Sequence, residues 1–271
     1  MTDQELVDAL AEVWSSIDGV CAPLSQAEWD AVTECPGWTV QDTVAHVIGI
    51  EAMSLGLPTP ELDPPDAPHV KNDVGRMNEI WVESLRTLDG AGVLDRYRDV
   101  TGQRLAGLRA LDTAGFGGES WTPVGPGTVR DLLPFRIFDS WVHEQDIRRA
   151  LGTPGHLTGP AADASIERVV GAMPYVIGKQ VKPPDGTSVV FDLGGAGGPR
   201  IVAIHVEGGR GKMLDIPPSS PTVKIATTLE VFTRLGCGRV DGTAALADGS
   251  VTLSGDDTLG RTVVEHMNFM F

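Results

Sequence analysis

The chain has 271 residues, of which 41% are hydrophobic and 21% are charged, and its net charge is −16 at pH 7. Because 37 acidic residues outnumber 21 lysines and arginines, it lacks the clustered positive charge on which nucleic-acid binding depends. No apolar run approaches the roughly 18 residues expected of a membrane span. We therefore expect no nucleic-acid partner and no membrane-spanning segment.

The N-terminus is acidic and lacks the basic-then-apolar pattern of a signal peptide, so we expect a cytoplasmic protein. Three cysteines, Cys21, Cys35 and Cys237, are too few and too dispersed for a disulfide framework or a cysteine zinc site. Cys35 precedes Pro36-Gly37 at the entrance of a predicted helix. A reactive thiol is conceivable there, but a small buried side chain is the favoured interpretation.

Helical periodicity dominates the first part of the chain. Apolar residues recur at helical spacing from Leu6 to Ile17. A proline-rich stretch, Pro58–Pro68, predicts a loop. Further helical runs follow at 73–88 and 94–111, and these two could be continuous.

Two more helices are indicated by similar starts. Thr39 stands three residues before Asp42, and Thr128 three residues before Asp131. Each pair predicts a capping box, in which the acid also complements the helix dipole. The segment Gly125–Gly127 is expected to be a turn that feeds the second of these helices. Four long helices with polar residues directed inward predict a bundle, a frequent host of metal sites.

The character of the sequence changes near residue 155, and we predict two domains, 1–155 and 156–271. The second should be a smaller α+β domain in which a glycine turn, Gly194–Gly198, joins two strands. Its predicted strands are 189–193, 200–206, 222–226 and 250–254, and its predicted helices are 161–176, 228–235 and 256–267.

Three residues suggest a metal site in the first domain. Asp139 and His143 are four residues apart in a helix-like run, so they share one face of the helix. A buried carboxylate and imidazole are costly without a partner. His46, from another predicted helix, would complete a three-ligand site with an open position for a divalent metal.

The choice of carboxylate ligand is open. Asp146 returns to the same helical stripe and could replace Asp139 or orient His143 from behind the metal. Glu144 should point elsewhere, toward Arg148 at i+4.

The positions of His46 and His143 along their two predicted helices impose a geometric condition on the site. If they ran parallel, their starts would have to be offset by one to two turns for His46 to reach His143, given about 1.5 Å of rise per residue. Two other histidines, His69 and His156, lie in a loop and in the interdomain linker. Both are expected to be solvated.

The motifs resemble a known family. The block Cys35-Pro-Gly-Trp-Thr-Val-Gln-Asp-Thr-Val-Ala-His46 is similar to the N-terminal domain of the mycothiol-dependent maleylpyruvate isomerase family, one of the DinB-like metal-binding four-helix bundles. The segment 136–148 looks like the fourth helix of that bundle. Two segments near the C-terminus, Leu235–Arg239 and Val251–Asp256, look like the sterol-carrier-protein-like domain often fused to it.

The resemblance implies a ligand set. In the family the metal is usually zinc, held by a histidine of the second helix and a Glu-x-x-x-His pair of the fourth, which places His46, Asp139 and His143 at the ligand positions. The aspartate at 139 departs from the family's glutamate and is shorter by one methylene. The metal or the helix must therefore move closer, or a water must intervene.

The resemblance also implies chemistry. A zinc-dependent enzyme would use a low-molecular-weight thiol such as mycothiol to isomerise or conjugate a small electrophile, with Arg239 as a candidate for binding a substrate carboxylate. The interpretation of Arg239 as a surface or structural arginine is equally well supported by the sequence. Two alternatives remain: a non-catalytic protein that binds an apolar small molecule, and a bundle whose degenerate site has lost its metal.

Overall fold

The computed structural model describes residues 1–195 and 197–270. The chain divides into two compact units, Met1–Ser165 and Ile166–Phe271. This division falls inside α8 (Pro160–Tyr175), whereas our proposed domain boundary at residue 155 would keep that helix whole. Among the described residues, none of the helices has the length and apolar character needed to cross a membrane.

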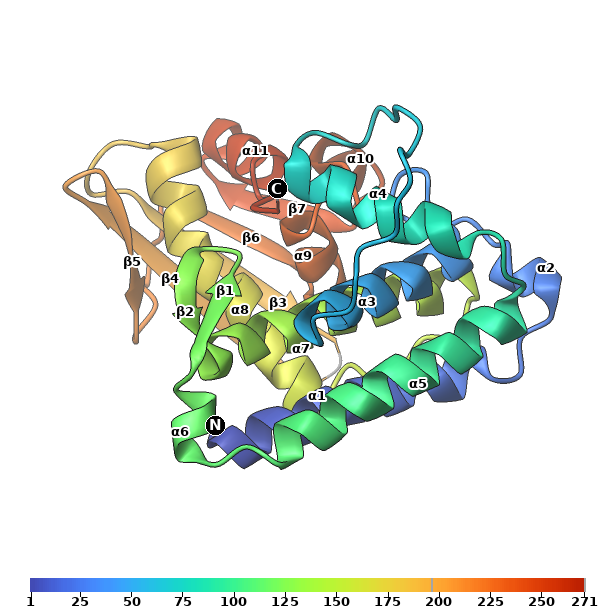
Figure 1. Ribbon diagram of the computed structural model, residues 1–271. Helices are drawn as coiled ribbons and strands as arrows, with labels where there is room; N and C mark the ends of the chain where they lie inside the picture. Colours follow the sequence, from blue (N-terminus) through green and yellow to red (C-terminus); the bar gives the residue numbers. More distant parts are fainter. Residues whose placement is uncertain (196, 271) are drawn as a thin grey trace. The chain divides into compact units, whose positions relative to one another are not determined.

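The first unit is built around four long helices, as predicted (Figure 1). They are α1 (Asp3–Cys21), α3 (Val40–Ser54), α5 (Gly90–Arg109) and α7 (Val129–Ala150). Both α1 and α3 pack against both α5 and α7, so the four helices enclose one core. A fifth helix, α4 (Asp73–Leu85), lies against α3.

Local sequence sets where these helices begin. The backbone N–H of Asp42 donates to the Thr39 hydroxyl, and the Asp42 carboxylate accepts from the Thr39 N–H. The same reciprocal pair forms at the start of α7, so both predicted capping boxes are confirmed. The runs at 73–88 and 94–111 are separate helices, because Asp89 caps a new helix at Gly90.

Short elements complete the first unit. They are α2 (Gln26–Trp29), α6 (Thr113–Phe116) and a hairpin of β1 (Glu119–Thr122) and β2 (Gly125–Thr128). The prediction of a turn at Gly125–Gly127 is therefore wrong. The chain reverses just before Gly125, and pairing with β1 holds these glycines in a strand.

The second unit contains a five-stranded sheet in the order β5-β4-β3-β6-β7. β3 pairs in parallel with β6, and all other neighbours are antiparallel. The strands are β3 (Ser188–Gly194), β4 (Arg200–Glu207), β5 (Arg210–Leu214), β6 (Val223–Thr228) and β7 (Val251–Gly255). The four predicted strands are confirmed. The edge strand β5 was missed because it is mostly exposed and carries little apolar signal.

Helices cover the apolar residues of this sheet. α9 (Leu229–Gly236) packs against β3 and β6, and α11 (Asp257–Glu265) against β6 and β7. Along the chain, α10 (Gly242–Ala247) comes between α9 and α11. A π-helical segment, Val176–Val181, continues α8. The predicted turn Gly194–Gly198 includes Ala196, which lies outside the described residues.

Candidate metal centre

The two helices that carry the predicted ligands run antiparallel. His46 on α3 faces Asp139 and His143 on α7, and five residues later on α3 Glu51 faces Arg136, which precedes Asp139 on α7. Contacts nearer the C-terminus of α3 are therefore made with residues nearer the N-terminus of α7. The offset of one to two turns between the helix starts was required only for parallel helices, so it does not apply here.

The structure brings the three predicted ligands together. Nε2 of His46 lies 3.4 Å from Oδ2 of Asp139, and Nε2 of His143 lies 3.7 Å from Oδ1 of the same carboxylate. The two imidazole rings approach edge to face with centroids 4.7 Å apart. One donor atom from each residue falls within 4.8 Å of the others. This spacing suits a single divalent cation with nitrogen and oxygen ligands about 2.0–2.2 Å away.

His46 is buried without a hydrogen bond. Neither its Nδ1 nor its Nε2 has a hydrogen-bond partner among the described residues. Burial lowers the pKa of His46, and Asp139 only partly offsets that effect. The ring is thus held neutral, with lone-pair density available to a cation. An orphaned, neutral imidazole facing a carboxylate fits a metal ligand.

Asp139 is held as an anion. Burial opposes ionisation, but the Arg136 guanidinium, followed by His46, keeps the pKa of Asp139 well below its usual range. Nη1 of Arg136 donates to Oδ2 of Asp139 at 2.9 Å. This contact fixes the short Asp139 side chain beside the two histidines.

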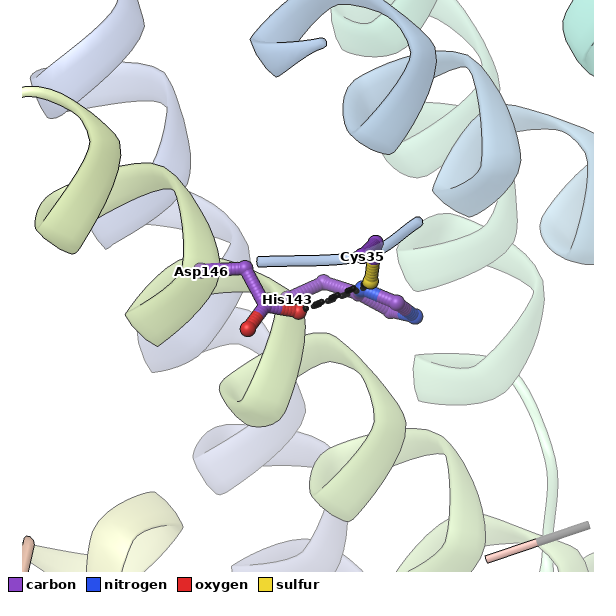
Figure 2. Close-up of side chains that lie close together, drawn as sticks. All are labelled: Cys35, His143 and Asp146. Atoms are coloured by element: carbon purple, nitrogen blue, oxygen red, sulfur yellow. Dashed lines mark hydrogen bonds and ion pairs between the residues drawn. The ribbon is translucent and has the colours of Figure 1, made fainter. Parts of the chain in front are cut away.

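The other nitrogen of His143, Nδ1, faces the side chains of Cys35 and Asp146 (Figure 2). Nδ1 of His143 lies 3.2 Å from Oδ2 of Asp146, and the Cys35 thiol donates to that oxygen at 3.2 Å. Sγ of Cys35 is also 3.9 Å from Nδ1. Although burial opposes protonation, the hydrogen bonds with Asp146 and Cys35 raise the pKa of His143 to about 10. Asp146 therefore fixes the proton on Nδ1 and directs Nε2 toward His46 and Asp139.

Asp146 is itself anchored from the same helix. Nη2 of Arg149 donates to Oδ1 of Asp146 at 2.7 Å, and Nε of Arg149 donates to Glu34 at 2.8 Å. Glu144 points away from the three ligands, as predicted, and accepts from Nε of Arg148 at 2.6 Å.

Trp38 packs beside the candidate ligands, with its ring tilted against both histidines. Its ring centroid lies 5.0 Å from that of His46 and 5.9 Å from that of His143. The indole N–H donates to buried Glu79 at 2.7 Å, and His69 contacts the same oxygen at 2.7 Å. The prediction that His69 is solvated is wrong, because the loop before α4 brings it to a buried carboxylate.

Two other predicted residues have partners outside the three ligands. His156 is paired with Glu144 and Glu12 through its two ring nitrogens, which corrects the expectation that it is solvated. Arg239 belongs to the second unit, where its Nη1 donates to the carbonyl of Cys237 at 3.0 Å. Its predicted role toward a substrate carboxylate stays a prediction.

Sequence reasoning missed several residues around the centre. Cys35 was treated as a small buried side chain, and Glu51 and Arg136 were not singled out. A signal was present for Arg136, because it lies three residues before Asp139 and seven before His143 and so shares their helical stripe. Cys35 opens the motif that ends at His46, and Glu51 follows His46 on α3. Their contacts with α7 could not be predicted, because residues more than 80 positions apart make them.

Residues 10–148 match the family described as "Mycothiol maleylpyruvate isomerase N-terminal domain". The chain belongs to this family. The predicted family and the prediction of an enzyme are confirmed at this level, and the family's activity is that of a thiol-dependent isomerase. No curated protein sequence matches the chain.

Solved structures extend the likeness beyond the helical part. A crystal structure of the mycothiol-dependent maleylpyruvate isomerase matches with a TM-score of 0.59 at 16% identity, over 94% of this chain and 93% of that chain. A histidine-to-alanine mutant of that isomerase matches at 0.58 and 15% identity, with the same coverage. Sterol Carrier Protein 2 Like 2 from Aedes aegypti is 21% identical over 37% of this chain and 90% of that chain, with a TM-score of 0.29. The predicted layout, helical first and α+β second, is confirmed.

Proposed function

We propose that this chain is a metal-dependent enzyme, with zinc as the resident cation, that uses a low-molecular-weight thiol such as mycothiol on a small electrophile. The ligands are His46, Asp139 and His143. The observation that supports this most directly is His46, whose two ring nitrogens are buried without hydrogen bonds beside an ionised carboxylate.

The donor set fits zinc. Two imidazoles and one carboxylate are typical of catalytic zinc sites, which leave a fourth position for water or substrate. When bound there, the cation would supply an electrophilic centre that lowers the pKa of a thiol and stabilises the thiolate near neutral pH.

The surrounding residues prepare the ligands. Asp146 holds one proton of His143 on Nδ1. Because the pKa of this ring is raised to about 10, a cation would displace the second proton, on Nε2, and bind the lone pair left there. Arg136 keeps Asp139 ionised and in place. Trp38 restricts the two histidine rings by packing beside them. We keep Arg239 as a candidate for holding a substrate carboxylate.

The proposed reaction is an addition of the thiolate followed by its elimination, and it needs no oxidant or reductant. The thiolate sulfur forms a bond to one carbon of an electron-poor double bond, and the other carbon receives the electron pair. Rotation about the resulting single bond and expulsion of the same thiolate restore the double bond in the other configuration. If the other carbon is protonated instead, the product is a thioether, which corresponds to thiol transfer.

Metal analysis of the purified protein tests the site. We expect about one zinc per chain in the wild type and loss of bound zinc in His46→Ala. His266→Ala is the matched control, because His266 is exposed and lies on the second unit. Undiminished zinc in His46→Ala would overturn the proposed ligand set.

A second experiment tests the reaction class. Zinc-loaded protein should consume an electron-poor alkene only when a thiol is present, and chelation should abolish that consumption. Thiol-independent turnover, or turnover that persists after chelation, would contradict the proposal.

A further inference from the structure

Cys35, His143 and Asp146 form a second group of donor atoms beside the candidate metal centre (Figure 2). Sγ of Cys35 and Nδ1 of His143 each lie 3.2 Å from Oδ2 of Asp146, and they lie 3.9 Å from each other. All three residues are buried. The nitrogen of His143 in this group is Nδ1, whereas Nε2 faces Asp139 and the ring of His46. One imidazole ring therefore lies between two groups of donors.

The backbone around Cys35 fixes the position of its sulfur. The carbonyl of Cys35 accepts from the N–H of Trp38 at 3.1 Å, and Gly37 lies at φ 81°. With Pro36 before this glycine, the four residues form a type II β-turn. The N–H of Cys35 donates to the Thr33 hydroxyl at 3.2 Å. Both backbone groups of Cys35 are thus held, and the chain becomes exposed directly after the thiol, at Pro36 and Gly37.

The three donor atoms are spaced as the ligands of one cation. Metal bonds of about 2.3 Å to sulfur and about 2.0–2.2 Å to nitrogen and oxygen would place tetrahedral ligands about 3.4–3.6 Å apart. The separations of 3.2, 3.2 and 3.9 Å differ from these values by less than about 0.5 Å. A cation between the three atoms therefore requires only small shifts of the side chains.

The charges of this group suit a divalent cation. A thiolate at Cys35 and the carboxylate of Asp146 carry two negative charges, which a divalent cation neutralises. Arg149 donates to the other oxygen of Asp146 and also to Glu34, so the outer arginine has an acid of its own. Buried charges are tolerated only when they are compensated in this way. The thiolate selects a soft cation, whereas the two imidazoles and the carboxylate of the first centre suit zinc.

We propose that Cys35, Nδ1 of His143 and Asp146 bind a soft, thiophilic divalent cation, and that this cation competes with zinc for His143. The thiol proton and the Nδ1 proton leave to solvent as the cation binds. A neutral imidazole has one lone pair for a ligand bond, so a cation on Nδ1 leaves the proton on Nε2. His143 is then lost to the centre that contains His46 and Asp139. The new site depends on its own geometry, and the competition rests on the proposed function.

Cadmium is the probe for the new site. A cadmium–thiolate bond gives a charge-transfer band in the ultraviolet that nitrogen and oxygen ligands do not give. Cd²⁺ added to the metal-free, full-length protein should produce this band. Cys35→Ser should abolish it, because serine keeps a hydroxyl near Asp146 but offers no thiolate. Cys21→Ser and Cys237→Ser are the matched controls and should keep the band, since both cysteines are buried outside this group.

Zinc-loaded protein tests the competition for His143. In the wild type, growth of the cadmium band should be accompanied by release of zinc, which elemental analysis measures after unbound metal is removed. At the same cadmium concentration, Cys35→Ser should retain most of its zinc. Equal release of zinc from both proteins would overturn the competition. Tryptophan fluorescence verifies that each variant is folded.

The outcomes separate this inference from the proposed function. His46→Ala should lose zinc yet keep the cadmium band, whereas Cys35→Ser should keep zinc and lose the band. A band that survives in Cys35→Ser, or the lack of a band in the wild type, would overturn the thiolate site. If His46→Ala keeps its zinc while Cys35→Ser loses the band, the proposed zinc centre fails and the cadmium site stands.

Discussion

The two units bury different kinds of side chain. Buried charged residues of the first unit include Glu51, Arg136, Glu144 and Asp146, and the buried histidines lie there as well. In the second unit, among residues 166–195 and 197–270, the buried polar side chains are uncharged: Thr187, Ser188 and Thr233. The sheet's core is otherwise apolar, as in the edge-to-face pair of Phe191 and Phe232, whose centroids are 5.3 Å apart.

This contrast shows where stability and chemistry are located. Apolar burial stabilises a fold without a specific partner. Buried charges cost free energy unless they are paired, and replacing such pairs by apolar residues is often neutral or stabilising. The first unit therefore keeps a costly polar core for a reason other than stability, and perturbed ionisable groups of this kind cluster at functional sites.

The units can be followed separately in solution. All six tryptophans, at positions 14, 29, 38, 81, 121 and 141, lie in the first unit. Tryptophan fluorescence therefore reports unfolding of the first unit, whereas circular dichroism reports both units.

The largest expected effect comes from breaking the buried charge cluster. Glu51→Gln leaves Arg136 and Arg104 without their shared acid, and we expect the free energy of unfolding of the first unit to fall by about 3–5 kcal/mol. Replacing the pair together, Glu51→Leu with Arg136→Met, should recover part of that loss, because Arg104 still lacks its acid and Asp139 its arginine. Urea unfolding followed by tryptophan fluorescence measures both. Equal destabilisation by the single and double variants would contradict the pairing.

The next effect concerns the residue behind His143. Asp146→Asn removes the carboxylate that fixes the proton on Nδ1, and we expect zinc affinity to fall by about 10- to 100-fold. Competition with a chromophoric chelator measures the change. Asp95→Asn, at an exposed position on α5, is the control and should bind zinc as the wild type does.

A substitution in the apolar core should act on the second unit alone. Phe191→Leu removes part of a fully buried ring, and we expect a loss of about 1–2 kcal/mol. Circular dichroism should show the change, while tryptophan fluorescence and zinc content stay as in the wild type. A fluorescence transition shifted as far as the dichroism transition would show that the units unfold together.

The smallest effect is a pH dependence at His156. Its hydrogen bond with Glu144, opposed by burial, raises the pKa of His156, so the protonated form stabilises the fold. This contribution is fully present below the unfolded pKa of about 6.5 and is lost as pH rises through the higher folded pKa. His156→Asn suits the left-handed backbone there, at φ 53°. Relative to wild type, it should lose more stability at pH 6 than at pH 9.5, and equal losses would contradict the charged pair.

Much of the fold could be predicted because it is encoded locally. The capping boxes at Thr39 and Thr128 need only residues three positions apart. Strand segments such as 189–193 are indicated by valine, phenylalanine and leucine around a single acid, Asp192. The edge strand β5 and the hairpin before α7 were missed because pairing with a neighbour, rather than their own composition, makes them strands.

The candidate site was predictable only in part. Asp139 and His143 share a helical face at a spacing visible in the sequence, and family resemblance linked them to His46. Their partners come from afar: Cys35 is 108 residues from His143, and Glu51 is 85 residues from Arg136. No short-range pattern predicts such contacts, because they depend on how the helices pack.

The sequence by itself indicated the long helices, four strands of the five-stranded sheet, the family and the three candidate ligands, since these follow from local propensity, periodicity and motif. The tertiary structure decided that α3 and α7 run antiparallel, and this orientation places Glu51 opposite Arg136 and His46 opposite His143. It also placed Cys35 and Asp146 behind His143. The physical reason is that a buried charge is tolerated only beside its partner, and folding alone brings those partners together.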